Sequence, residues 1–374
     1  MSRSNDPGHY FQTTEALATS ERKAAKSKNK HGHPIKLPSK ILAVCDDGEG
    51  GVYAAEAAGD VKRVVLDTGK TERIFTQGIA PLTCLALHPS TKTLYTGSWD
   101  KKIYAIPLSP STDNKTQPLT SHTDFLKCLL PATLSNQPIL LSGAADATLI
   151  LWSLSTHKPL RRLPSPTKAL QSLAIDPDSL TPEAFTLFTA SSDREIRRWH
   201  ISLEKCYELD EEPILAHETS IYKLHFDSDG DLWTASADKT AKHLVRARNW
   251  EADTVLQHPD FVRDVLPFDD LGLVVTACRD EEVRVWEISS GELVCVYSGH
   301  FEEITGLARR GERREVVSVG IDGTVRVWSL ERGEMKRFAE EKGKGKEEVV
   351  EEKKESLMTA EEEAELAELM EDDD

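Results

Sequence analysis

Three residue types that can act together as a nucleophilic catalyst recur along this sequence at similar distances: histidine, a hydroxyl residue and aspartate. One copy of the trio is His122, Ser142 and Asp146. In a hydrolase, the histidine takes a proton from the hydroxyl while the carboxylate orients the imidazole. A catalytic centre needs one copy of this trio, but here it is repeated along the chain. We therefore predict that the trios are buried structural groups and that the protein has no catalytic residue.

An aspartate in a tight turn between two apolar segments defines the repeated unit. The aspartates are Asp100, Asp146, Asp193, Asp238, Asp280 and Asp322, with steps of 46, 47, 45, 42 and 42 residues. Four residues before them stand Thr96, Ser142, Thr189, Thr234, Thr276 and Ser318, and six residues after them Ile106, Trp152, Trp199, Leu244, Trp286 and Trp328. The histidines, 21 to 24 residues upstream, are His122, His217, His258 and His300. Four strands of about five residues with their turns fill such a step, which predicts one small sheet per repeat.

A seventh copy precedes these six, at residues 50–66. Ala58 takes the place of the aspartate and Val64 that of the tryptophan, and Ala58 lies 42 residues before Asp100. Terminal repeats are often atypical, so seven copies fit the register. Two later repeats lack the histidine, one of them with Gly78 at its position. We expect those two repeats to be less rigid.

The pattern over residues 40–339 resembles the WD-repeat family, in which these four residue types form a hydrogen-bonded tetrad within each blade. The resemblance implies an all-β, seven-bladed β-propeller with flexible charged tails at both ends, acting as a scaffold for other macromolecules. The tetrad residues of the three repeats that have all four types are His122, Ser142, Asp146, Trp152, His258, Thr276, Asp280, Trp286, His300, Ser318, Asp322 and Trp328.

The repeat and the composition together predict the domain boundaries. We expect a disordered basic tail over residues 1–39, the propeller over 40–340, and an acidic tail with a short helix over 341–374. Two solutions exist for closing the ring. Either residues 333–341 form the last outer strand, or residues 33–39 pair there from the N-terminal side.

The predicted binding site lies where propeller loops surround the central channel, since loops on a rigid scaffold concentrate binding residues. In the family, the residue five after the histidine and the residue before the aspartate lie near the channel mouth. The predicted partner contacts at these positions are Trp99, Lys127, Tyr222, Arg263, Arg279 and Thr305. Aromatic and arginine side chains are typical of interface hot spots, and arginine binds carboxylates and phosphates through paired hydrogen bonds. We predict that an acidic or phosphorylated peptide binds here; alternatively, these are scattered surface residues without a shared partner.

Both predicted tails are charged. The N-terminal tail carries the basic cluster Arg22, Lys23, Lys26, Lys28 and Lys30, which indicates a nuclear localisation signal, a nucleic-acid contact or a solvated terminus. In the C-terminal tail, one apolar face of a predicted helix is formed by Leu366, Leu369 and Met370. Such a helix fits a partner's groove, or else the segment is a disordered acidic solubilising tail.

Charge and cysteine placement exclude several classes of protein. The formal net charge is −17, of which counting assigns −12 to residues 41–340. An acidic body disfavours general binding to a phosphate backbone. None of the six cysteines lies in a C-x-x-C pair or at zinc-ligand spacing, which indicates free thiols and no metal site. No 18 consecutive apolar residues and no apolar leader occur, so we expect a soluble intracellular protein of the nucleus, the cytoplasm or both.

The predicted function is therefore that of a non-enzymatic scaffold or adaptor without cofactor. We expect it to bind one or more protein partners, to contact no membrane, and to be monomeric within a hetero-complex. The alternative is an accessory subunit of an RNA-associated complex in ribosome assembly or RNA modification. Nucleic acid would then be contacted indirectly or through the N-terminal tail.

Overall fold

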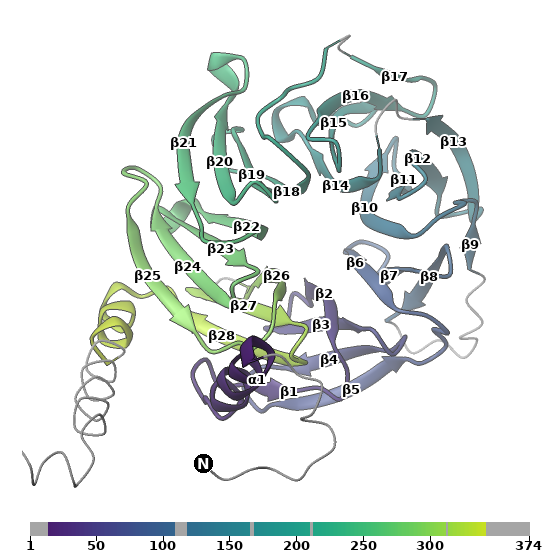
Figure 1. Ribbon diagram of the computed structural model, residues 1–374. Coiled ribbons are helices and arrows are strands. Elements are labelled where there is room, and N and C mark those ends of the chain that lie inside the picture. The colour runs from purple at the N-terminus through teal and green to yellow at the C-terminus, as the bar shows by residue number, and fades with distance from the viewer. Residues whose placement is uncertain (1–13, 109–117, 165–167, 210–211, 312, 342–374) are drawn as a thin grey trace, which may run out of the picture. The chain divides into compact units, whose positions relative to one another are not determined.

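The computed structural model describes residues 14–108, 118–164, 168–209, 212–311 and 313–341. The chain divides into two compact units, Met1–Trp328 and Ser329–Asp374. The described strands form seven sheets of four strands each. The seven sheets surround a central channel as the blades of a propeller (Figure 1). The predicted all-β, seven-bladed propeller is thus confirmed.

Each blade pairs its strands in chain order from the centre outward. Blade one contains β2 (Ile41–Asp46), β3 (Gly51–Glu56), β4 (Val61–Val65) and β5 (Lys70–Phe75). Blade two contains β6 (Leu82–His88), β7 (Thr93–Ser98), β8 (Lys102–Pro107) and β9 (Leu119–Thr120). Blade three contains β10 (Leu126–Leu134), β11 (Gln137–Ala144), β12 (Thr148–Ser153) and β13 (Lys158–Pro164). Blade four contains β14 (Leu170–Ile175), β15 (Ala184–Ser191), β16 (Ile196–Ser202) and β17 (Cys206–Glu208).

The remaining three blades follow the same plan, except for the outer strand of the last. Blade five contains β18 (Ile221–Phe226), β19 (Leu232–Ser236), β20 (Thr240–Val245) and β21 (Glu251–Gln257). Blade six contains β22 (Val262–Phe268), β23 (Leu273–Cys278), β24 (Glu282–Glu287) and β25 (Leu293–Ser298). Blade seven contains β26 (Ile304–Arg309), β27 (Glu315–Gly320), β28 (Thr324–Ser329) and, as its outer strand, β1 (Ile35–Lys36).

The hydrophobic core lies between the blades. The second strand of a blade is covered on both faces, and every residue of β3 and of β23 is buried. Such strands read as continuous apolar runs, because neither face meets water. One cluster joins Tyr95 of blade two to Trp152 of blade three. The innermost strands also contact their neighbours all round the ring, β2 and β26 included.

Blade seven closes the ring with a strand from the other end of the chain. Ile35 and Lys36 of β1 pair antiparallel with Val325 and Thr324 of β28. Of the two predicted closures, the N-terminal one is therefore correct, and residues 35–36 belong to a blade although they were assigned to the tail. The alternative was wrong because residues 332–341 form a helix, which good helix formers and the Lys336–Glu340 pair, 4.0 Å apart, favour.

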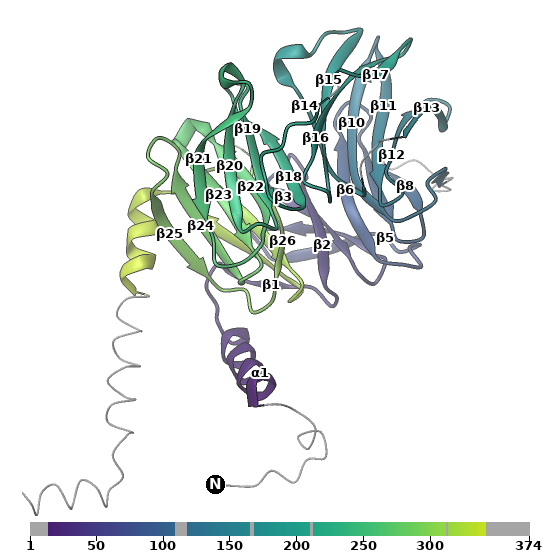
Figure 2. The same cartoon turned by 45° about the horizontal axis from the view of Figure 1, so that its top comes forward.

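The N-terminal segment corrects a second expectation, since it contains helix α1 (Thr14–Ser27) where a disordered tail was predicted. Arg22 and Lys26 both bind the buried carboxylate of Glu281, at 2.8 and 2.7 Å. Lys23 binds Glu302 at 2.8 Å. Alanine, lysine and arginine favour a helix locally, and these ion pairs hold it against blades six and seven. Figure 2 shows α1 standing off one face of the ring, joined to β1 by a connecting segment.

Besides α1 and the helix of residues 332–341, the described helices are single 3-10 turns in loops. They are η2 (Pro177–Ser179), η3 (Arg246–Arg248) and η4 (Asp269–Leu271). Within the described ranges, no helix combines the length and the apolar character needed to cross a lipid bilayer. The predicted C-terminal contacts Leu366, Leu369 and Met370 lie outside the described residues.

Candidate functional site

The tetrad of blade seven is a continuous chain of hydrogen bonds. The indole of Trp328 donates to Ser318 Oγ at 2.8 Å, and Ser318 Oγ lies 2.7 Å from His300 Nε2. The carboxylate of Asp322 can only accept, so the proton of the neutral imidazole lies on Nδ1, and Nε2 accepts from the hydroxyl of Ser318. His300 Nδ1 then donates to the carboxylate of Asp322 at 2.9 Å.

The hydrogen bonds follow the same sequence as in a nucleophilic triad, from hydroxyl to histidine to carboxylate, but this arrangement cannot perform the chemistry of a triad. Ser318 and His300 are completely buried, so no substrate can reach the hydroxyl. Burial lowers the pKa of His300, which keeps the imidazole neutral at physiological pH. This tetrad therefore connects strands within its blade.

Blade three repeats this geometry, and blade five repeats most of it. Ser142 Oγ accepts from Trp152 at 2.8 Å and lies 2.7 Å from His122 Nε2. Burial would raise the pKa of Asp146, but hydrogen bonds, first that from Thr148, lower it to about 2. In blade five, where leucine replaces tryptophan, His217 still bridges Thr234 and Asp238, at 2.7 and 2.8 Å.

Blade six corrects one predicted tetrad. His258 Nε2 lies 2.8 Å from Thr276 Oγ1, which accepts from the indole of Trp286 at 2.9 Å. The predicted fourth member, Asp280, instead binds Arg284 through two hydrogen bonds of 3.1 and 2.6 Å. His258 Nδ1 is left beside the carbonyl of Leu256, at 3.0 Å. Asp280 therefore pairs with the permanently charged guanidinium of Arg284, four residues later in the same hairpin, and not with the neutral imidazole of His258.

The blades that lack a histidine or an aspartate use other polar partners. In blade two, Asp100 accepts a 2.5 Å hydrogen bond from the hydroxyl of Tyr104. Blade one, with alanine at the aspartate position, instead buries Glu56, whose carboxylate lies 2.7 Å from the ammonium of Lys62. Each substitute again satisfies buried polar groups inside one blade.

One backbone hydrogen bond is repeated in all seven blades and defines a common face. The residue before the aspartate position donates its N–H to the carbonyl just before the innermost strand of the same blade, at 2.8–3.0 Å. The pairs are Ala57–Lys40, Trp99–Pro81, Ala145–Phe125, Ser192–Ala169, Ala237–Ser220, Arg279–Phe261 and Ile321–Glu303. We call the face formed by these fourteen residues and the second residue of each innermost strand the channel-mouth face.

An exposed aromatic pair occupies the channel-mouth face at blades two and three. The rings of Trp99 and Phe125 stack with centroids 5.4 Å apart. They remain 47% and 40% exposed, although aromatic side chains of this size are usually covered. Phe125 was missed because the position directly before an innermost strand was not considered. The repeated backbone bond now identifies that position as part of the face.

A cationic cluster occupies the same face at blades five to seven. Arg263 lies 4.4 Å over the ring of Tyr222 and binds the carboxylate of Glu303. Arg279 lies 5.2 Å over the ring of Phe261 and 3.9 Å from the same carboxylate. Three predicted contacts are thus brought together: Tyr222, Arg263 and Arg279. Their shared counter-ion was not predicted.

Several polar side chains of the channel wall connect neighbouring blades. Thr305 Oγ1 donates to the carbonyl of Ile41 at 2.9 Å and so joins blade seven to blade one. Thr83 makes the equivalent bond from blade two to the carbonyl of Leu126 at 2.6 Å. The hydroxyl of the predicted contact Thr305 is therefore used for ring closure.

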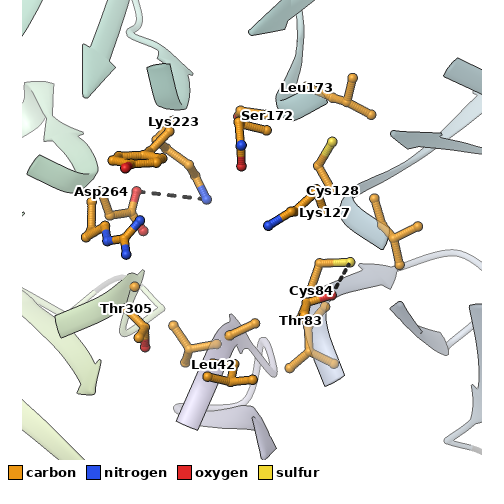
Figure 3. Close-up of a pocket in the computed structure, with 18 residues that line it drawn as sticks. Leu42, Thr83, Cys84, Lys127, Cys128, Ser172, Leu173, Lys223, Asp264 and Thr305 are labelled. Carbon is orange, nitrogen blue, oxygen red and sulfur yellow. Dashed lines mark hydrogen bonds and ion pairs between the residues drawn. The ribbon is translucent and has the colours of Figure 1, made fainter. Parts of the chain in front are cut away.

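The predicted contact Lys127 lines the channel itself. The channel cavity has a volume of about 190 Å³ and is also lined by Gln171, Tyr222, Lys223 and Arg263. Figure 3 shows the side chains of Lys127 and Lys223 extending into the open centre. The channel-mouth face thus combines an aromatic half, a cationic half and a polar channel.

Similarity to known proteins identifies the family. The sequence matches the WD domain, G-beta repeat family over residues 69–105, 211–243 and 291–329. An uncharacterized WD repeat-containing protein of Schizosaccharomyces pombe is 34% identical over 384 residues, covering 99% of this chain and all of that protein. The chain belongs to the WD-repeat family.

Two more distant similarities leave the partner open. Pre-mRNA-processing factor 19 of Mus musculus is 24% identical over 216 residues, covering 54% of this chain and 40% of that protein. The WD40 propeller domain of Doa1 matches with a TM-score of 0.68 at 18% identity, covering 81% of this chain and 97% of that domain.

The titratable groups of this WD-repeat propeller are mainly structural. All six cysteines are free, and burial raises the pKa of Cys45 to about 11 and that of Cys84 to about 12. Such thiols stay protonated and are poor nucleophiles. In the part of the chain that the structure describes, no group of three or more His, Cys, Asp or Glu could hold a metal ion.

Proposed function

We propose that this WD-repeat protein is a non-enzymatic scaffold that binds a protein partner through its channel-mouth face, within an intracellular complex of the nucleus, the cytoplasm or both. The observation that carries the proposal is the stacked pair Trp99 and Phe125, which stays about half exposed where no core needs it. Aromatic residues on a rigid turn lose little entropy on binding and dominate interface energetics.

The cationic half of the face favours an acidic or phosphorylated segment as the partner's contact. Arg279 has a side chain 49% exposed and lies 3.9 Å from Glu303, too far for a hydrogen bond. Its guanidinium is therefore open to a second carboxylate or phosphate. Arg263 is already bound by Glu303 and stacked on Tyr222, so it supports Arg279 as a fixed neighbouring charge.

The alternative function, an accessory subunit of an RNA-associated complex, has weaker support. It draws on the basic N-terminal cluster and on a relative named as a pre-mRNA-processing factor. Three of the five basic residues, however, are paired with propeller carboxylates: Arg22, Lys23 and Lys26. Paired cations gain less from releasing the counter-ions of a nucleic acid.

The test is affinity capture of the tagged full chain from its native cells, with and without nuclease, read by quantitative mass spectrometry. One variant carries Trp99→Ala and Phe125→Ala, and a second carries Arg279→Glu. We expect nuclease-resistant partners to fall roughly tenfold or more in both variants, because hot-spot truncations cost about 2 kcal/mol.

Matched controls separate loss of the face from loss of any exposed residue. Tyr207→Ala removes an aromatic side chain of β17 that is similarly exposed, and Arg248→Glu reverses an exposed charge in η3. Both should retain the partners. Undiminished capture by the Trp99/Phe125 and Arg279 variants would exclude the channel-mouth face, and loss of all partners on nuclease treatment would favour the RNA-associated alternative.

A further inference from the structure

We infer that the central channel binds one phosphate-type oxyanion between Lys127, Gln171 and Lys223. These residues occupy the second or third position of the innermost strands of blades three, four and five, which are consecutive in the ring. All three line the channel cavity. Both ammonium groups extend toward the channel centre (Figure 3).

Four other polar side chains of the channel wall already form hydrogen bonds to neighbouring blades. Thr83 and Thr305 donate to carbonyls of the next blade, and Ser172 Oγ accepts from the N–H of Leu224 at 3.1 Å. Asp264 accepts from the N–H groups of Val265 and Leu307, both at 2.9 Å. These side chains hold the ring together and are not free to bind a ligand.

Lys127 and Lys223 are not held to neighbouring blades by such hydrogen bonds. Lys127 has no hydrogen-bond or ion-pair partner among the residues that the structure describes. Lys223 lies 3.9 Å from Asp264, whose oxygens already accept two backbone bonds, so this ion pair is loose. Gln171 adds an amide donor from the blade between them. A cradle of uncommitted donors therefore spans three blades.

The charge of the channel indicates which ligand fits this cradle. The residues lining it include three cations, Lys127, Lys223 and Arg263, but only one carboxylate, that of Asp264. Arg263 is held by Glu303 at the mouth. An excess of positive charge in a confined site is stabilised by an anion. A phosphate group, with up to two negative charges and at least three oxygens, matches two ammonium groups and an amide better than one carboxylate does.

The cavity leaves room for such a group. Its volume of about 190 Å³ is many times the roughly 10–15 Å³ that a single water needs. The phosphate group is either free inorganic phosphate or part of a phosphorylated side chain that the partner inserts from the channel-mouth face. The second source rests on the proposed function, whereas the first is independent of it.

The test is calorimetric titration of the full chain at pH 7 and constant ionic strength with two probes, inorganic phosphate and acetyl-phosphoserine amide. The variants are Lys127→Gln and Lys223→Gln, with Lys127→Arg as a charge-retaining variant. The control is Lys158→Gln, an exposed lysine of β13 in the same blade as Lys127. We expect each glutamine variant to bind at least one probe roughly tenfold more weakly, while Lys127→Arg and Lys158→Gln bind like the wild type.

The outcomes show which source supplies the anion, and they test the channel site and the scaffold function separately. Tighter binding of acetyl-phosphoserine amide supports a partner's phosphorylated side chain, and equal or tighter binding of inorganic phosphate supports a free anion. The channel site is overturned when neither probe binds the wild type, or when both glutamine variants bind as the wild type does. If the aromatic variant still loses its partners in that case, the scaffold function stands; if the probes bind but no partner depends on the face, only the scaffold function fails.

Discussion

Blades six and seven carry the same four tetrad residue types at nearly the same offsets, yet their aspartates have different partners. Asp322 of blade seven is held by His300, whereas Asp280 of blade six is held by Arg284. The difference is visible in burial, since the side chain of Asp322 is 0% exposed and that of Asp280 is 20% exposed. A matching motif therefore does not guarantee a matching hydrogen-bond network.

The residue two positions after the aspartate accounts for part of the difference. In blade seven, Thr324 donates its hydroxyl to Asp322 at 2.8 Å and its N–H at 2.9 Å. Thr148 and Thr240 make the same two contacts in blades three and five, where the histidine link is also intact. Blade six has Glu282 at this position. A second carboxylate cannot donate to the first, so the aspartate is left for the arginine.

The rest of the difference between the two aspartates comes from the partner of the arginine four positions after each of them. Both blades have one, but Arg326 of blade seven donates to the carbonyls of Asn29 and His31 in the N-terminal segment. Arg284 of blade six finds Asp280 instead. The segment that closes the ring thus also draws the competing cation away from the tetrad of blade seven.

Removing each aspartate gives the largest expected effect. Asp322→Ala removes the acceptor of four donors: His300 Nδ1, the N–H groups of Phe301 and Thr324, and the hydroxyl of Thr324. We expect a loss of roughly 3–5 kcal/mol in the free energy of unfolding, measured by urea titration. Asp280→Ala should cost about 1–2 kcal/mol, because the site is wetter and Arg284 keeps Glu282 nearby, at 3.9 Å. Equal losses would show that the two networks are equivalent after all.

The features predictable from the sequence are those set by local offsets. The recurrence of hydroxyl, aspartate and tryptophan fixes the blade count, because each copy needs the same two strands and turn. The sequence allowed two candidates for the strand that closes the ring. The correct one pairs through only two residues, Ile35 and Lys36, which is too short to show the alternation of apolar and polar residues typical of a strand. Helix α1 was missed because its support comes from Glu281 and Glu302, more than 250 residues away in the chain.

The site was predictable only in part for the same reason. Positions near the channel mouth were identified, and Tyr222, Arg263 and Arg279 do meet there. That Glu303 binds these arginines, and that Thr305 is used for ring closure, depends on contacts between blades. One signal was available and overlooked: the threonine two residues after the aspartate marks the blades whose histidine link is intact.

The pH dependence of stability gives the next largest expected effect. Burial, with help from the nearby Arg284, lowers the pKa of His258 to about 4. The unfolded chain takes up this proton near pH 6.5, so the folded state loses stability as the pH falls from about 6.5 to 4. This one histidine accounts for about 3 kcal/mol over that window.

His258→Gln should therefore flatten the acid side of the stability profile relative to the wild type. His157→Gln, at an exposed turn, serves as the control and should follow the wild type. Urea unfolding at half-unit pH intervals provides the measurement. Parallel loss of stability in the wild type and in the His258 variant would mean that other buried groups dominate the acid transition.

Converting blade six toward blade three gives the smallest expected change in stability and the sharpest structural readout. The double variant Glu282→Thr with Arg284→Ile supplies the threonine and removes the competing cation, as Thr148 and Ile150 do around Asp146. Asp280 should then turn to His258 Nδ1, and the new carboxylate should raise the pKa of His258 above its present value of about 4. We expect the free energy of unfolding to change by less than about 1 kcal/mol, because one network replaces another. An NMR titration of the imidazole measures the pKa directly, and an unchanged value would mean that the turn geometry of blade six, rather than its two neighbouring side chains, keeps the aspartate away from the histidine.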